Sequence, residues 1–353
     1  MRPPHSGAWW LWALGLAVAA SRTTNPVLLA VILAVAGFVA VHCRSNAPWS
    51  SAYGMFLKFG LLVIAIRLVF SIVVGGITGP TVLFTLPEVL LPDWAKGIRL
   101  GGDVTAEGLV HALYQGLQLA TLLCCIGAAN ALADPRRLLK SVPAALYEVS
   151  AAVVVALTVA PQLAVSARAV RRARALRGDA ARGRNAIRTL LVPVLEDALD
   201  RSLHLAAAMD SRGYGRTAGL PKRTRVTTAV LVLGGLIGLC VGAYGLLDAE
   251  APAFVGVPVL IVGVVLAVAG LVLGSRRLAR TRYRPDRWTV PSVLIAASGA
   301  AAGAAAVLAE AFGELALIPS TVPLTAPEVP VVPVIGVLVA LLPVLLARRE
   351  ALS

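Results

Sequence analysis

Long apolar segments separated by short polar ones dominate the pattern along the chain. Several of these segments exceed the roughly 18 residues that indicate a membrane-crossing helix. Backbone groups in lipid must be hydrogen-bonded within the protein, and the segments are rich in Ala, Leu and Val without alternation, so they predict helices rather than a β-barrel. The pattern therefore predicts an all-α fold, a polytopic helical bundle in the cell membrane.

The expected spans form two groups of four, one on each side of a polar stretch. The first group comprises residues 9–20, 26–41, 55–74 and 106–133. The second group comprises residues 226–247, 254–273, 290–308 and 334–347. Residues 75–105, with three prolines, are expected to form a longer loop between two spans.

Composition and charge exclude several classes of protein. Only 14% of the residues are charged and 58% are hydrophobic, whereas an ordinary globular protein carries about 25% charged residues. The net charge of +14 fits the Lys and Arg excess of cytoplasmic loops better than it fits nucleic-acid binding. No cysteine pair has zinc-ligand spacing with histidine nearby, so free thiols and no metal or cofactor site are expected; the cysteines are Cys43, Cys124, Cys125 and Cys240.

One basic stretch interrupts the apolar pattern. Residues 166–225 hold 14 Arg and Lys against 5 Asp and Glu. A polar, helix-prone stretch of this charge indicates a cytoplasmic segment. Four spans on each side of it place both termini in the cytoplasm. The chain then divides into an N-terminal transmembrane region (1–133), cytoplasmic coupling helices (134–225) and a C-terminal transmembrane region (226–353).

The apolar run at residues 144–167 has basic clusters on both flanks, which are Arg136, Arg137 and Lys140 on one side and Arg168, Arg171, Arg172 and Arg174 on the other. A crossing helix would leave one cluster outside, against the positive-inside tendency. The run also contains Glu148, Pro161 and Gln162. The pattern favours a helix that lies at, or dips into, the cytoplasmic face over one that crosses.

A second helix, predicted over residues 187–209, is amphipathic. Its apolar residues recur at spacings of three and four and mark one face; they are Ile187, Leu190, Leu191, Val194, Leu195, Ala198, Leu199, Leu203 and Ala206. Asp197 and Arg201 lie off this face, four residues apart with the acid first, as in a weakly stabilising surface ion pair. Pro193 is expected to kink the helix or set its start.

Two triplets place an arginine in the last turn of a predicted helix and a glycine at its end. They are Leu176-Arg177-Gly178 and Ser211-Arg212-Gly213. For either triplet alone, an arginine that complements the helix dipole is the favoured interpretation. Two such ends, joined by a helix of roughly 40 Å, instead favour contacts with two partner subunits. A third dipeptide, Arg182-Gly183, ends no predicted helix.

These residues resemble the T component of energy-coupling factor (ECF) transporters, a membrane scaffold family that includes the cobalt-transport Q-type proteins. The similarity lies in RARALRG (172–178) and LAAAMDSRGYG (205–215), and more weakly in FGLLVIAIRLVF (59–70) and ADPRRLLKSVP (133–143). The resemblance implies that the two triplets dock two ABC-type ATPase subunits. The second triplet is the firmer match, and Ala181-Arg182-Gly183 is a less favoured candidate for the first. It also implies a small membrane-embedded substrate-binding (S) subunit that takes up a vitamin or a transition-metal ion. The three apolar runs after residue 247 depart from the family pattern.

Arg67 lies inside the third expected span. Intramembrane arginines are costly and often functional, but a structural partner, such as a helix-end carbonyl or Glu148, is the favoured interpretation.

Enzymatic activity is not expected of the chain itself. It lacks the Gly-x-x-x-x-Gly-Lys-Ser/Thr motif of ATP-hydrolysing proteins, and Asp, Glu and His are almost absent from its spans. A self-contained secondary transporter or other permease is the alternative, but its spans would carry polar breaks near the midplane and an internal repeat.

Overall fold

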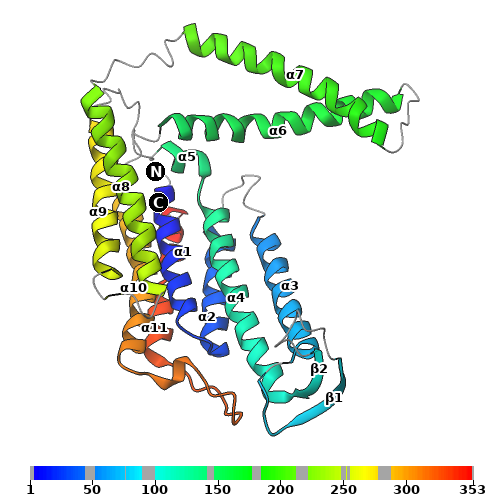
Figure 1. Ribbon diagram of the computed structural model, residues 1–353, viewed down its shortest axis with the longest axis vertical. Coiled ribbons are helices and arrows are strands. Elements are labelled where there is room, and N and C mark those ends of the chain that lie inside the picture. Colours follow the sequence, from blue (N-terminus) through cyan, green and yellow to red (C-terminus); the bar gives the residue numbers. More distant parts are fainter. Residues whose placement is uncertain are drawn as a thin grey trace. The chain divides into compact units, whose positions relative to one another are not determined.

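The computed structural model describes residues 4–43, 52–75, 77–89, 100–140, 147–176, 184–211, 222–247, 252, 255–276 and 288–351 (Figure 1). The chain forms two compact units, the first comprising Met1–Leu138 with Asp286–Ser353 and the second Leu139–Pro285. Most of the described residues are helical, which confirms the predicted all-α class. The three-part division at residues 133 and 225 stays a prediction about function.

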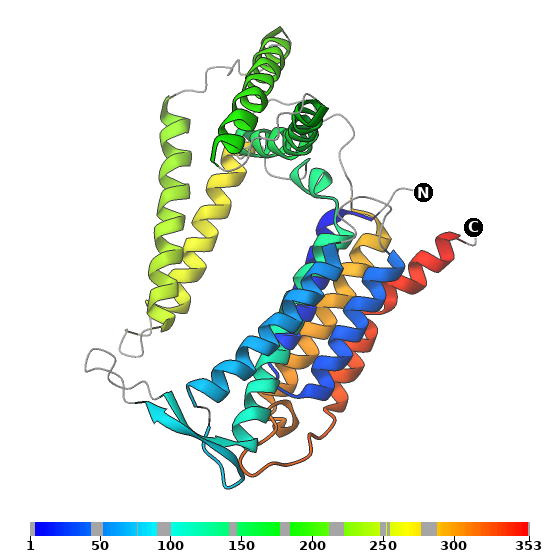
Figure 2. The ribbon, with the colours of Figure 1, turned by 90° about the vertical axis from the view of Figure 1, so that its right-hand side faces the viewer.

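The first unit contains most of the N-terminal helices together with the last helices of the chain. Its elements are α1 (Ser6–Ser21), α2 (Pro26–Cys43), α3 (Ala52–Val73), β1 (Val82–Val89), β2 (Leu100–Thr105), α4 (Ala106–Leu132), α10 (Val290–Ala311), the 3-10 turn η4 (Leu315–Leu317), α11 (Val331–Val339) and α12 (Leu342–Ala351). The short helix α5 (Pro135–Lys140) lies at the boundary between the two units in the sequence. Figure 2 shows α1 and α2 in blue beside α10 in orange and α11 in red.

The segment between α3 and α4, predicted as a loop, contains two antiparallel strands. Thr105 pairs with Val82, and the register shifts between Leu86 and Val89. Pro87 lies at this shift, where the lack of a backbone N–H does not interrupt the ladder. The prediction missed the strands because prolines and glycines weaken the alternating pattern that marks a strand.

A close approach of two backbones holds α1 against α10. A methyl group at Gly15 would overlap the carbonyl of Gly299, and one at Gly299 would overlap the backbone of Trp12. At Gly303 an added Cβ would lie 2.9 Å from the Gly15 carbonyl oxygen. Small residues allow this packing, which membrane helices use because apolar burial alone gives little association in lipid.

The turn between α1 and α2 is clamped to the segment that follows α10. The hydroxyl of Thr23 donates to the carbonyl of Leu317 at 2.7 Å. The fully buried Asn25 side chain donates to the carbonyls of Ala316 and Glu328 at 2.7 and 2.6 Å and accepts from the amide of Val27. Asn25 therefore caps the start of α2 while holding two turns of the C-terminal part of the chain.

The predicted last span, residues 334–347, is not one helix. It is broken between α11 and α12, and the amide of Ala340 bonds back to the carbonyl of Val337 in a tighter turn. The buried indole of Trp12 lies against this break and donates to the Ala340 carbonyl. The C-terminal helices are thus part of the core of the first unit, a role that the sequence did not indicate.

The second unit contains α6 (Tyr147–Leu176), α7 (Arg184–Ser211), α8 (Lys222–Leu247) and α9 (Val257–Arg276). α8 and α9 pack along each other through glycines: an added Cβ at Gly238 would lie 2.9 Å from the Cα of Gly263. α6 and α7 pack against each other in a shorter contact.

Seven described helices are long and apolar enough to cross a membrane, namely α2, α3, α4, α6, α8, α9 and α10. α1 and the α11–α12 segment are apolar but shorter. The chain is therefore a multi-pass membrane protein. α6 meets the criterion of length and composition, and the prediction that it lies at the cytoplasmic face rests on charge alone.

Candidate functional site

The predicted coupling region contains two long helices, α6 and α7. The sequence suggested two successive helical segments up to residue 177, whereas α6 is one helix of 30 residues that continues through Pro161. Its C-terminal half carries the exposed side chains of Arg168, Arg171 and Arg172. The N-terminal half of this helix is therefore apolar and the C-terminal half is cationic.

α7 confirms the amphipathic helix predicted over residues 187–209. It begins at Arg184, so Pro193 lies inside the helix rather than at its start. The predicted apolar face is largely exposed within the second unit: Leu191, Leu195, Leu199 and Leu203 are 49%, 56%, 61% and 65% exposed. These four leucines, called the leucine stripe of α7 below, recur every fourth residue and form one continuous surface.

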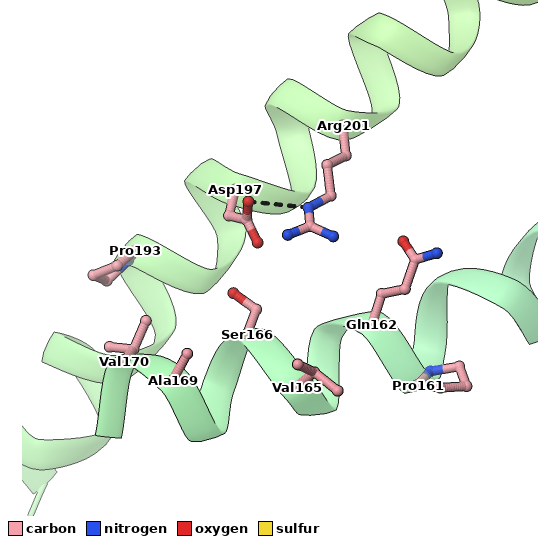
Figure 3. Close-up of a pocket in the computed structure, with 9 residues that line it drawn as sticks. All are labelled: Pro161, Gln162, Val165, Ser166, Ala169, Val170, Pro193, Asp197 and Arg201. Carbon is pink, nitrogen blue, oxygen red and sulfur yellow. Dashed lines mark hydrogen bonds and ion pairs between the residues drawn. The ribbon is translucent and has the colours of Figure 1, made fainter. Parts of the chain in front are cut away.

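The crossing of α6 and α7 encloses a pocket of about 540 Å³ (Figure 3). Six residues of α6 and three of α7 line it. Those of α6 are Pro161, Gln162, Val165, Ser166, Ala169 and Val170, and those of α7 are Pro193, Asp197 and Arg201. Both helix-interior prolines therefore lie where the helices cross. Proline removes a backbone hydrogen bond from each helix at this point.

A polar contact fixes the same crossing. Arg201 Nε donates to Asp197 Oδ1 at 3.0 Å, which confirms the predicted ion pair. The hydroxyl of Ser166 points from α6 toward the Asp197 carboxylate (Figure 3). The hydrogen bond from Arg201, followed by the one from Ser166, lowers the pKa of Asp197. Asp197 therefore links the two helices as a carboxylate at neutral pH.

The sequence did not identify Ser166 or Gln162 as part of this crossing. The only signal was their spacing of four residues on one face of α6. Nothing in the pattern of α6 specifies which turn of α7 it contacts.

The first residues of both predicted docking triplets are the last residues of the two helices. Leu176 ends α6 and is 89% exposed, and Ser211 ends α7 with its hydroxyl bonded to the Ala208 carbonyl at 3.0 Å. The remaining members, Arg177, Gly178, Arg212 and Gly213, lie outside the described residues.

Arg67 lies on α3, and its side chain is exposed. The part of the chain that the structure describes provides it with no ion pair. The side chain of Glu148, the carboxylate considered as its partner, lies outside the described residues. No cluster of three or more His, Cys, Asp or Glu side chains that could hold a metal ion occurs among the described residues.

Comparison with known families matches residues 4–223 to a family described as CbiQ, cobalt transport protein. The match covers α1 to α7 and ends at the start of α8. It includes α6, α7 and both predicted docking triplets. No protein of curated function matches the chain.

Proposed function

The chain belongs to the CbiQ family of cobalt transport proteins, and on that premise we propose that it is the energy-coupling scaffold of an ECF-type ABC importer. In this role it connects two ATPase subunits to a small membrane-embedded S subunit that binds the substrate. The substrate is a transition-metal ion or a vitamin. The proposal rests chiefly on one observation, the pair of crossed helices α6 and α7 with an unpartnered apolar surface and cationic ends.

The leucine stripe of α7 supports contact with an S subunit. Four leucines that are about half to two-thirds exposed form an apolar surface of the kind that marks an interaction site. Charged residues also lie along this part of α7, among them Glu196, Asp200 and Arg201. A membrane-embedded partner can bury the stripe while those polar residues stay in water.

The ends of α6 and α7 support docking of two ATPase subunits. The short connection between the helices brings the end of α6 close to the start of α7, so Leu176 and Ser211 lie at opposite ends of α7 (Figure 1). With 28 residues, α7 separates them by roughly 42 Å. This separation suits two similar subunits that each bind one arginine, Arg177 on one and Arg212 on the other.

Arginine suits such a contact because its guanidinium is always charged and presents five donors in a rigid fork. When ATP draws the ATPase subunits together, the two arginine-tipped ends move with them. The crossing near Asp197 transmits this movement between the helices, and the leucine stripe transmits it to the S subunit. The chain itself carries no ATP-hydrolysing motif, so it couples the reaction without performing it.

A pull-down of the tagged chain from membranes tests the proposed function. A scaffold brings down two cassette ATPase subunits and a small membrane protein, and ATP hydrolysis by the purified complex supports uptake of metal ion or vitamin in vesicles. A chain that transports its substrate alone, without co-purifying ATPases, overturns the proposal.

A further inference from the structure

The outward face of α3 carries an unpaired charge inside the membrane. α3 packs chiefly on α4, through contacts such as Gly60 against Ala120, and many of its other apolar side chains are exposed in the first unit. Leu61 and Phe70 are 70% and 62% exposed. Arg67 lies in this segment, which is apolar enough to cross the membrane, and its side chain is exposed.

Among the described residues, no carboxylate forms an ion pair with Arg67. Asp103 of β2 and Glu107 of α4, whose elements contact α3, form no ion pair with it. The Cβ of Arg67 packs at the seam with α4, where a Cβ added at Gly116 would lie 3.5 Å away. The side chain of Arg67 therefore starts at the α3–α4 seam, and neither of these acids pairs with it.

The direction of the side chain distinguishes a protein partner from lipid headgroups. Arg67 lies six residues, or about 9 Å, before the end of α3 at Val73. Helical side chains lean toward the N-terminus of their helix, so that of Arg67 leans away from its nearer membrane surface. Lys58, six residues after the start of α3, leans toward its nearer surface and can reach headgroups. The Cα–Cβ bond of Arg67 therefore starts toward the hydrocarbon region, where an unpaired charge is costly.

We infer that the α3–α4 seam is an intramembrane docking surface on which Arg67 binds a carboxylate from a transmembrane helix of the S subunit. The inference rests on the proposed function and adds a second contact to the one at α7. Charge complementarity fixes the chemistry of the partner, because a guanidinium in hydrocarbon is best matched by a bidentate carboxylate. The apolar side chains beside Arg67 then cover the remainder of the partner helix.

The test compares Arg67→Met with Lys58→Met in the complete complex purified through a tag on this chain. Lys58→Met is a matched control, because it removes the other cation of α3. We expect Arg67→Met to reduce the co-purified S subunit at least fivefold while the ATPase subunits stay at the wild-type level. Lys58→Met should leave both at the wild-type level.

Suppressors of Arg67→Asp identify the partner. A compensating Lys or Arg in place of an acidic residue in a membrane helix of the S subunit supports the inference. A suppressor at Glu148 or another acid of this chain overturns the inference. So does Arg67→Met if the amount of co-purified S subunit is unchanged, or if the S subunit and the ATPases are lost together. A wild-type chain that brings down neither kind of subunit overturns the proposed function as well, so the two failures are distinguishable.

Discussion

The indole N–H of Trp12 donates a 3.0 Å hydrogen bond to the carbonyl oxygen of Ala340, which is 328 residues away in the sequence. Trp12 lies in the part of the chain that matches the CbiQ family, and Ala340 lies in the part that follows the match. The bond supplies a partner to a carbonyl left free where α11 ends and α12 begins. The helices beyond the family match are thereby joined to the core of the first unit.

Trp12→Phe keeps an aromatic side chain, removes the donor and replaces the indole by a smaller ring at a fully buried position. The buried Ala340 carbonyl is then unsatisfied, which should lower the free energy of unfolding by about 1–3 kcal/mol. Thermal unfolding of the purified protein in detergent measures this loss. Trp10→Phe, at a partly buried neighbouring position without this bond, should change the midpoint little. Equal shifts of the unfolding midpoint in both variants would show that the hydrogen bond to Ala340 does not contribute to stability.

Gly299→Ala should disrupt the crossing of α1 and α10. The added methyl group would overlap the backbone of Trp12, so the helices must separate, at a cost of about 3 kcal/mol or more. Gly234→Ala provides the control because nothing lies within 4 Å of the added Cβ. That change should be neutral or stabilise α8 by about 0.5–1 kcal/mol. Gly299→Ala should lower the unfolding midpoint. Gly234→Ala should leave the midpoint unchanged or raise it.

Arg177→Ala and Arg212→Ala should each weaken docking of one ATPase subunit. Truncation of an interface hot-spot arginine costs about 2 kcal/mol or more, which corresponds to about a 30-fold rise in Kd. The double variant should abolish transport and release both ATPases in pull-downs. Arg182→Ala serves as the control, since Arg182-Gly183 ends no helix predicted from the sequence. If the ATPases co-purify with the double variant, neither arginine is required for docking.

Leu199→Glu should reduce binding of the S subunit while leaving the ATPases bound. The substitution places a charge in the middle of the leucine stripe of α7, where burial against a membrane partner would leave it without solvent. Ala208→Glu adds the same charge at an exposed position on the opposite side of α7. Quantitative pull-downs should show loss of the S subunit in the first variant alone. An S subunit that tolerates Leu199→Glu binds elsewhere.

The crossing of α6 and α7 should depend on pH only under strongly acidic conditions. Hydrogen bonds from Arg201 and Ser166 lower the pKa of Asp197, so the folded protein favours the carboxylate form. That contribution is present above the ordinary pKa of about 3.9 and is lost as pH falls through the lowered value. Spin labels at Ala164→Cys and Leu205→Cys should therefore report one distance between pH 5 and 8, and a broader distribution only when the pH falls through the lowered pKa, below about 3.9.

Asp197→Asn is the control for this titration. It should give the broader distribution at every pH, because the amide cannot replace the charged partner of Arg201. A wild-type distribution that broadens between pH 5 and 7 would instead assign the transition to another group.

Much of the fold was determined by the sequence alone. The length of the apolar segments predicted α2, α4, α8 and α10, since only helices satisfy backbone groups in lipid. The three-and-four spacing of leucines predicted the exposed face of α7, and the order of Asp197 and Arg201 predicted their ion pair. These features are local, because a period or a spacing within one helix fixes them.

The tertiary structure decided which helices meet. The contact of Trp12 with Ala340, the fit of Gly15 to Gly299 and the approach of Ser166 to Asp197 join residues whose separation carries no periodic signal. Each depends on two surfaces that match in shape or hydrogen bonding only after the chain has folded. For the same reason, the apolar runs after residue 247 predict further spans but do not indicate that α10, α11 and α12 pack in the core of the first unit.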